Sequence, residues 1–402
     1  MNMNENVSNV LRFNKDALRR KSYLYNMLNG KNELLGMLDS FDYEDKVAAL
    51  EEMFAKYIGA EHAILTGSGS NSLELVLDCI GIKSNTKVLL QAYTCAMLKN
   101  IIAEFATPQF VDTDLNSYNA NISDIKNKTI KESVILLVHS YGNPAPIDEL
   151  SDFAQEKNSI IIEDCAHALG AEYKGKKVGS FGKASIFSLR KNLAVGSGGF
   201  IVTNDDTLAK KILIKREGFE KNRFRAHDIF AAGALVTRSI LKENPMHLSM
   251  LYNLYFHNRS PHRLLTLLGV SIATEQLKQL DNFIQKTEEN AKYLTKKLKN
   301  IDNLILPEVK NDVRHVYTKY PIRFRNLERH SLSEVCGALF LNGFQPCNML
   351  YSYDFIENVG KNISEYPKSK IIADTMVPVG LPSNLKKEDI NVIANIFEKF
   401  AN

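Results

Sequence analysis

The sequence predicts an α/β protein whose mostly parallel, seven-stranded sheet carries helices on both faces. Short apolar and β-branched runs alternate with longer segments of helical periodicity, which is typical of such sheets. The link between the runs ending at Ser188 and starting at Gly199 is too short for a crossover helix, so one strand of that pair should run antiparallel. The 402-residue chain also has room for a smaller second domain.

The expected strands follow one another through the first half of the chain, with helices between most of them. The strands are Ala63–Thr66, Lys87–Gln91, Gln109–Asp112, Val134–His139, Ser159–Glu163, Ser185–Ser188 and Gly199–Thr203. The helices are Tyr43–Tyr57, Ser70–Ile80, Thr94–Phe105, Ile147–Lys157 and Thr207–Arg216. We expect residues 1–272 to form the large domain, with an irregular segment of loops and short helices at about 226–272.

The second half of the chain predicts a linker helix and a small α+β domain over residues 273–402. The helix is expected over Thr274–Leu298, where apolar residues recur at helical spacing. Beyond it we expect strand Thr318–Arg325, helix Ser331–Leu341, a strand near Met376–Pro378 and helix Lys387–Phe400.

Composition excludes several classes of protein. The net charge of +4 is small and dispersed, which argues against nucleic-acid binding. The five cysteines are scattered without metal-ligand spacing, so we expect no metal site and a reducing compartment. Neither a signal-peptide core nor an apolar run of bilayer length occurs, so we expect a cytoplasmic protein without membrane contact.

A glycine- and serine-rich turn, Thr66 to Ser72, lies between a predicted strand and a predicted helix. Gly67 and Gly69 allow the backbone to approach an anion, and the helix N-terminus offers N–H groups and a positive dipole end. Ser70 can add a hydroxyl donor to a phosphate. The same turn also fits an ordinary helix cap.

A carboxylate, an imidazole and an amine lie near the ends of neighbouring strands. Asp164 follows an apolar strand, His167 comes three residues later, and Lys191 precedes the glycine-rich stretch Gly196–Gly199. A lysine can form an imine with an aldehyde cofactor, and a carboxylate can hold a heteroaromatic nitrogen protonated. Together they suit pyridoxal phosphate (PLP). Taken singly, each also fits an ordinary capping, core or surface role.

Many segments in the right order resemble the DegT/DnrJ/EryC1/StrS sugar aminotransferases, which are PLP-dependent and have the aspartate-aminotransferase fold (fold type I). The resemblance runs from about Tyr43 to Phe400. The segments that carry it are Leu50–Leu73, Ala92–Thr94, Gln109–Asp112, Val138–Gly142, Glu163–Gly170, Gly175–Ser180 and Ser188–Asn204. It implies a three-layer fold with the mostly parallel seven-stranded sheet.

The resemblance implies a role for each matching residue. Lys191 matches the Schiff-base lysine, Asp164 the partner of the pyridinium nitrogen, and His167 a residue near the ring oxygen. The phosphate-binding positions are matched by Gly69, Ser70 and Ser188, with Ser185 as an alternative to Ser188.

The chain also departs from the family pattern. Cys95 stands where an aromatic residue often stacks on the cofactor ring, and Tyr93 is a candidate substitute. The segment that reaches a neighbouring subunit's site is blurred, with Asn258 and Arg259 as candidates. Ser188 and Lys191 are closer together than in many members. These changes affect the expected substrate more than the cofactor.

The expected function is therefore PLP-dependent transamination of a keto-sugar, nucleotide-linked or a free keto acid sugar. Glutamate is the expected donor, and the pathway is amino-sugar or surface-polysaccharide biosynthesis. The resemblance implies a homodimer. Two alternatives stay open: a catalytically silent PLP-binding regulator, and another fold-type-I reaction. Of the latter, a sugar 3-dehydratase is disfavoured because such enzymes lack the lysine found here as Lys191.

Overall fold

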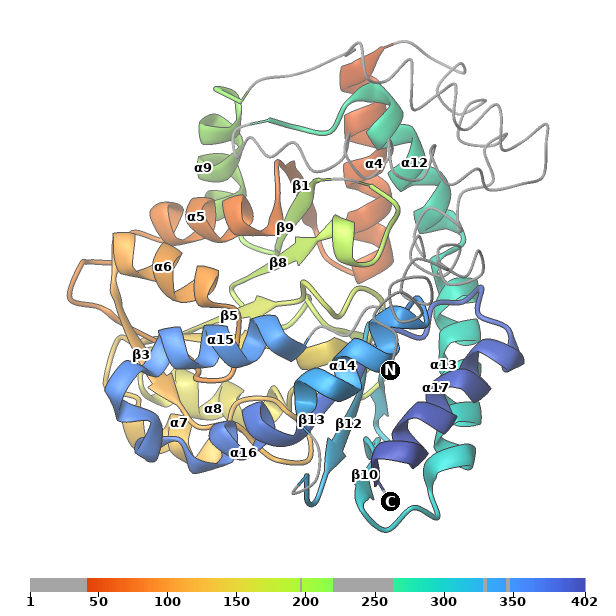
Figure 1. The fold of residues 1–402 in the computed structure, drawn as a ribbon. Helices are drawn as coiled ribbons and strands as arrows, with labels where there is room; N and C mark the ends of the chain where they lie inside the picture. Colours follow the sequence, from red (N-terminus) through yellow and green to blue (C-terminus); the bar gives the residue numbers. More distant parts are fainter. Residues whose placement is uncertain (1–41, 196, 220–262, 328–330, 345–347, 402) are drawn as a thin grey trace, which may run out of the picture.

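The computed structural model describes residues 42–195, 197–219, 263–327, 331–344 and 348–401. A seven-stranded sheet lies at its centre, in the order β1-β9-β8-β5-β4-β2-β3 (Figure 1). The strands are β1 (His62–Thr66), β2 (Lys87–Gln91), β3 (Thr107–Val111), β4 (Val134–Val138), β5 (Ile160–Asp164), β8 (Ala184–Ser188) and β9 (Gly199–Thr203). Strand β9 runs antiparallel to both of its neighbours, and the other pairs are parallel. The predicted sheet, including its one antiparallel strand, is confirmed.

Helices cover both faces of this sheet. One face carries α5 (Gly69–Cys79), α6 (Ala96–Phe105) and α9 (Asp206–Arg216). The other carries α7 (Ile122–Lys128), α8 (Asp148–Glu156) and α4 (Tyr43–Ile58), and α12 (Leu267–Lys278) packs beside α4 (Figure 1). Strand β4 explains why both faces need cover. Its five residues are all buried, and alternate side chains belong to the two opposite cores.

Helix α4 is held to the antiparallel corner of the sheet by aromatic packing. The ring of Phe54 stacks on Phe200 of β9 at 4.0 Å and meets Phe187 of β8 edge-on at 5.1 Å. Each such pair adds about 0.5–1.5 kcal/mol beyond the burial of its area. These contacts hold β8 in place, and the chain leads from the end of β8 directly to Lys191.

The single long helix predicted over Thr274–Leu298 is wrong. Two helices, α12 and α13 (Leu280–Leu298), meet at Gln279, whose φ of −108° and ψ of 3° are not helical. Helix α12 is buried nearly all round, whereas α13 is amphipathic and leads away into a second core. Because the two helices have different surfaces to bury, the chain turns between them. Since α12 begins at Leu267, the predicted irregular segment also ends too late; its residues 226–262 lie outside the described ranges.

The C-terminal part has its own core and a three-stranded antiparallel sheet. The sheet consists of β10 (Leu304–Ile305), β12 (Tyr320–Phe324) and β13 (Met376–Val379). It packs with α13, α14 (Leu332–Leu341) and α17 (Lys387–Ala401). The strands and helices predicted here are confirmed in place. The proposed domain boundary at residues 272/273 stays a prediction.

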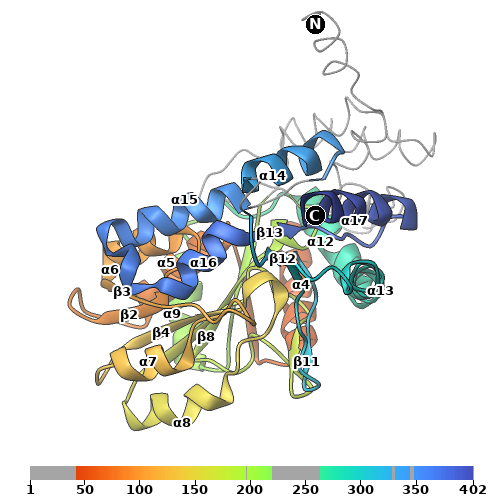
Figure 2. The same ribbon diagram turned by 60° about the horizontal axis from the view of Figure 1, so that its bottom comes forward.

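The sequence predicted neither α7 nor two helices of the C-terminal part, α15 (Asn348–Val359) and α16 (Pro367–Thr375). These two lie side by side near α5 and α6 (Figure 2). Helix α15 contacts α6, and both new helices join a small core with Tyr93 and Tyr141. A small sheet of β6 (Glu172–Tyr173), β7 (Lys176–Lys177) and β11 (Val313–Arg314) joins the segment between β5 and β8 to the segment before β12. Among the helices that the structure describes, none is long and apolar enough to cross a membrane.

Candidate active site

The carboxyl ends of five strands meet at one edge of the sheet and surround a cavity of about 340 Å³. The turns after β1, β2, β4, β5 and β8 each contribute to its lining. Residues from Gly67 to Lys191 are thereby brought together, although they are far apart in sequence. Open α/β sheets bind their ligands at this edge.

Lys191 and His167 face each other in this cavity. Lys191 ends a short 3-10 helix, Leu189–Lys191, that follows β8, and its Nζ lies 3.0 Å from Nε2 of His167. Burial lowers the pKa of His167 well below its usual value, and the nearby charges of Lys191 and Lys319 lower it further. His167 is therefore a neutral imidazole, which can accept a hydrogen bond from the Lys191 ammonium.

Backbone contacts keep the two loops in register. The side-chain amide of Asn192 donates to the carbonyl of Ala166 at 3.0 Å. The hydroxyl of Thr318, from the segment before β12, donates to the carbonyl of His167. These bonds hold the backbone at Ala166 and His167 and the residue next to Lys191. The distance between His167 and Lys191 is therefore set by the fold as well as by the two side chains.

Asp164 is the last residue of β5 and lines the same cavity with only 5% of its surface exposed. Burial raises the pKa of its carboxyl, against the backbone N–H of Ala166 and the charge of Lys191, which lower it. The Ala166 N–H donates to Oδ1 at 2.9 Å. A buried carboxylate of this kind is stabilised by a cationic partner in the cavity.

The predicted phosphate turn forms the N-terminus of α5. Ser68 caps the helix, because its hydroxyl accepts from the N–H of Asn71 at 3.1 Å. Gly69 and Ser70 line the cavity at the first turn, where helical N–H groups have no intrahelical acceptor. A Cβ on Gly69 would lie 3.0 Å from Cβ of Ser188, so the glycine lets this turn approach β8 closely.

Ser188 and Ser185 have different surroundings. Ser188 lines the cavity beside the phosphate turn. Ser185 is fully buried in β8, and its hydroxyl donates to the carbonyl of Gly179 at 2.6 Å, so it lies outside the group. An odd separation along a strand places the two side chains on opposite faces.

Both candidates for the ring-stacking position line the cavity. Tyr93 is buried and packs against Phe355 of α15, with 6.5 Å between ring centroids. Cys95 is half-buried at the start of α6; burial raises the pKa of its thiol. Their role toward a cofactor ring stays a prediction. Asn258 and Arg259, proposed to reach a neighbouring subunit, lie outside the described residues.

Tyr141 was missed by sequence reasoning. Its ring lies nearly parallel to that of His167, 6.1 Å away, and it lines the cavity. Its backbone adopts φ of 58°, which is uncommon for a residue with a side chain and concentrates at functional sites. The tyrosine lies within the segment Val138–Gly142, but nothing local in the sequence predicted its conformation.

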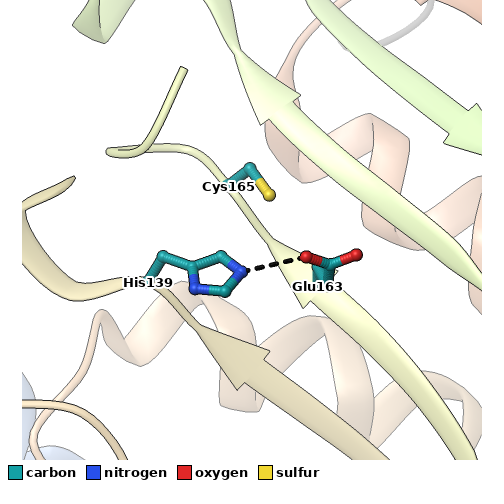
Figure 3. A group of neighbouring side chains, drawn as sticks. All are labelled: His139, Glu163 and Cys165. Carbon is teal, nitrogen blue, oxygen red and sulfur yellow. Dashed lines mark hydrogen bonds and ion pairs between the residues drawn. The ribbon is translucent and has the colours of Figure 1, made fainter. Parts of the chain in front are cut away.

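A buried cluster of His139, Glu163 and Cys165 lies close to the cavity (Figure 3). Its atoms are close enough for a metal ion, yet the lone pairs of His139 and Glu163 are already engaged. Nε2 of His139 lies 3.2 Å from Glu163, and the other ring nitrogen, Nδ1, accepts from the N–H of Ala145 at 2.9 Å. With Nδ1 accepting, Nε2 of His139 is the nitrogen that can donate to Glu163.

Glu163 accepts three further bonds, from the backbone N–H groups of Gly179, Phe181 and Gly182 at 2.7–2.9 Å. Burial alone would raise the pKa of Glu163, but the bonds from His139 and the backbone outweigh it and lower the pKa. The cluster thus holds the loop over 179–182 against β5. It is an anchor of the fold rather than a metal centre.

Comparison with known proteins identifies the chain. The sequence profile of the DegT/DnrJ/EryC1/StrS aminotransferase family matches residues 31–398. The chain belongs to this family. It is therefore a transaminase, and the predicted family and enzyme class are confirmed.

Several relatives of the family have named activities. GDP-perosamine synthase of Escherichia coli O157:H7 is 32% identical over 70% of this chain and 70% of its own length. dTDP-3-amino-3,6-dideoxy-alpha-D-galactopyranose transaminase of Aneurinibacillus thermoaerophilus is 28% identical, covering 88% and 90%. The crystal structure of 3-amino-5-hydroxybenzoic acid synthase superposes with a TM-score of 0.75 at 21% identity, covering 92% and 96%. The fold-type-I α/β class is thereby confirmed.

Family members are aminotransferases of the PLP-dependent type, and the cavity residues fit that cofactor. Asp164 offers a buried carboxylate to a protonated ring nitrogen, and the N-terminus of α5 offers N–H groups to a phosphate. Lys191 supplies an amine between them. Gln91 also belongs to the lining, and its buried Oε1 has no hydrogen-bond partner among the described residues.

Proposed function

We propose that this protein transfers an amino group from glutamate to a keto-sugar, using PLP held in the cavity by Lys191 and Asp164. The observation that carries the proposal is the 3.0 Å approach of Lys191 Nζ to a neutral His167, in a cavity that Asp164 also lines. The family and its named sugar-transaminase relatives support the same reaction.

PLP, when bound, supplies an electron sink for carbanion chemistry at an amino acid's Cα and carries the amino group between substrates. Asp164 would hold the proton on the ring nitrogen, because its carboxylate gains a cationic partner and loses the cost of unpaired burial. The α5 N-terminus at Gly69 and Ser70, with Ser188, would bind the phosphate.

Lys191 would move the proton that transamination transfers. Its Nζ must be neutral to accept a proton. His167 accepts a hydrogen bond from Nζ through Nε2, which orients the amine without supplying a second positive charge. Tyr141 lies alongside the His167 ring.

The substrate class follows from the relatives. The names of two relatives specify sugars linked to GDP and dTDP. We assign a nucleotide-linked keto-sugar as acceptor, with a free keto acid sugar as the alternative. Glutamate is assigned as donor.

We also propose a homodimer. Two large apolar side chains about one helical turn apart remain exposed on α15, Tyr353 at 67% and Ile356 at 52%. Exposed apolar groups of this size gathered on one surface are typical of protein interfaces. Light scattering checks the assignment: a fully active monomer would exclude it.

The decisive experiment follows the absorbance of the purified holoprotein. Glutamate should shift the cofactor absorbance, and a keto-sugar should restore it, with the aminated product detected by mass across a panel of GDP-, UDP- and dTDP-linked and free keto-sugars. Lys191→Ala should abolish this cycle. A protein that binds PLP but does not cycle with any acceptor would instead be a silent binder, and full turnover by Lys191→Ala would exclude the mechanism.

A further inference from the structure

The wall of the cavity between β2 and α6 is a short irregular segment, Ala92–Cys95. Three of its residues, Tyr93, Thr94 and Cys95, line the cavity. Within the backbone, the N–H of Ala92 donates to Val111 of β3 at 2.8 Å, and the N–H of Thr94 donates to the carbonyl of Ala92 at 3.1 Å. Such a segment needs partners for its carbonyls, because a buried backbone carbonyl without one is costly.

Two buried side-chain amides supply those partners. Nδ2 of Asn358, on α15, donates to the carbonyls of Ala92 at 3.1 Å and Thr94 at 3.0 Å. Nε2 of Gln91 donates to the carbonyl between them, that of Tyr93, at 2.9 Å. Three consecutive carbonyls of the wall are therefore bound by side-chain amides rather than by a helix or sheet.

Both amides act here as donors only. Gln91 is 2% exposed and Asn358 is 8% exposed. The oxygens Gln91 Oε1 and Asn358 Oδ1 are buried without a hydrogen-bond partner in the part of the chain that the structure describes. Asn358 Nδ2 bonds to two carbonyls, and Gln91 Nε2 bonds to the carbonyls of Tyr93 and Tyr118 and lies 3.0 Å from Oγ of Ser140. Because carbonyl oxygens only accept, the nitrogens must face them, and this fixes the orientation of each amide. A carboxylate at either position could not make these bonds.

The rest of α15 is bonded to the helix that follows the wall. Nζ of Lys99 donates to the carbonyl of Glu357 at 3.0 Å, and it lies 3.6 Å from the Glu357 carboxylate. Asp354 accepts a hydrogen bond from the N–H of Ala96, at the first turn of α6, where Cys95 makes no side-chain cap. Helix α15 therefore holds both the wall and the start of α6.

We propose that Asn358 and Gln91 are positioning residues that set the shape of the cofactor cavity by holding Ala92–Thr94 in place. Through Asn358, the placement of α15 from the C-terminal part of the chain determines where Tyr93 and Cys95 face the ligand. The proposal rests on the proposed function in one respect, that PLP is the ligand of the cavity.

The test compares Asn358→Asp and Gln91→Glu, which keep size but remove the donors, with Asn290→Asp. Asn290 donates in the same way to the carbonyl of Pro382, at 2.8 Å, but does not line the cavity. Three measurements are made. The affinity of the apoprotein for PLP is measured by absorbance titration, and hydrogen exchange is followed over residues 92–96 of the apoprotein. The alkylation rate of Cys95 in the holoprotein is followed on its peptide by mass.

We expect the affinity for PLP to weaken about tenfold or more in the two wall variants, as the loss of one or two hydrogen bonds implies. Exchange over 92–96 and alkylation of Cys95 should both accelerate, while Asn290→Asp matches the wild type. If the carboxylate variants do not fold, Asn358→Ala removes the donors without adding charge. Wild-type affinity and exchange in a folded Asn358 variant would overturn the proposal.

Failure of the proposed function would look different. In that case the wild-type protein itself would not bind PLP, whereas exchange over 92–96 in the apoprotein would still respond to Asn358→Asp. If the wild-type protein binds PLP and exchange over residues 92–96 is unaltered in every variant, the positioning role alone is refuted.

Discussion

Gly199 packs so closely on Ser68 that a Cβ at position 199 would lie 2.5 Å from the carbonyl carbon of Ser68. The first residue of β9 thus touches the turn that precedes α5, and the N–H of Gly198 donates to the carbonyl of Gly67 at 2.8 Å. The position of the expected phosphate site therefore depends on a strand more than a hundred residues further along the chain.

Gly199→Ala should displace the α5 N-terminus, because the atoms in the way belong to the backbone and cannot rotate aside. We expect a loss of about 1–3 kcal/mol in stability, as for other overpacked sites, and weaker PLP binding. Thermal unfolding and a PLP titration measure the two effects. Gly175→Ala, where an added Cβ meets nothing within 4 Å but φ is 75°, is the control for backbone cost without collision.

Asp164→Asn should keep the fold and lower kcat by on the order of 10²–10⁴, the range that a proton-holding group contributes. The amide cannot keep a ring nitrogen protonated through its charge. Steady-state kinetics with circular dichroism separate rate from folding, and Asp152→Asn on the exposed side of α8 is the matched control. An unaltered rate would remove Asp164 from this role.

Two variants of His167 separate the effect of its hydrogen-bond acceptor from the effect of its ring. His167→Leu removes the hydrogen-bond acceptor of Lys191 Nζ, and we expect kcat to fall by about 10²-fold. His167→Gln retains an acceptor oxygen and should lose less. Equal rates in both variants would mean that the 3.0 Å contact has no part in catalysis.

His315 predicts a dependence of stability on pH. Burial lowers its pKa to about 3, and its Nδ1 accepts from the N–H of Tyr317 at 2.9 Å. The unfolded chain binds a proton near the ordinary value of 6.5, while the folded chain does not. Stability is therefore complete above pH 6.5 and is lost as the pH falls toward 3, by up to about 1.4 kcal/mol per pH unit for this one proton.

The measurement is the Tm of the wild type and of His315→Gln across this range. The variant should be less stable at neutral pH, because it loses the stacking of His315 on Tyr317, but its Tm should fall less steeply with acid. Parallel curves for the two proteins would exclude His315 as a source of acid sensitivity; His167, also neutral in the fold, contributes equally to both curves.

Glu163→Gln should destabilise the fold by about 1–3 kcal/mol, because one amide nitrogen would face backbone donors that now meet a carboxylate. Thermal unfolding measures the loss, with the exposed Glu156→Gln as control. Since the lone pairs of the His139–Glu163 pair are engaged, dialysis against a chelator should leave the Tm unaltered. A metal ion recovered in equal amount with the protein would contradict this.

Much of the sheet could be predicted because short apolar runs such as Val134–Val138 are bounded by polar turns. The site residues at strand ends could be predicted for a related reason: parallel strands share one carboxyl edge, so Asp164 and Gly69 come together whatever the loops do. The choice between Ser185 and Ser188 needed the register of β8, which the sequence did not give.

Other features depend on contacts between distant segments. The bond of Asn358 to Ala92 has no periodic or local signature, because it depends on how the C-terminal part packs against α6. The break at Gln279 was hidden because apolar residues continue at helical spacing through both helices. The positive φ of Tyr141 has no signature in the sequence, because residues other than glycine rarely adopt it.

The place of β9 between β1 and β8 has a consequence for synthesis on the ribosome. Strand β1 precedes the other described strands of the sheet, and among them it pairs with β9 alone, so it lacks that partner until residue 203 has left the exit tunnel. Until then the nascent chain exposes the unpaired backbone groups of β1. Non-local pairing of this kind is slow and exposed to aggregation. Cofactor capture must therefore be a late event, following insertion of the one antiparallel strand.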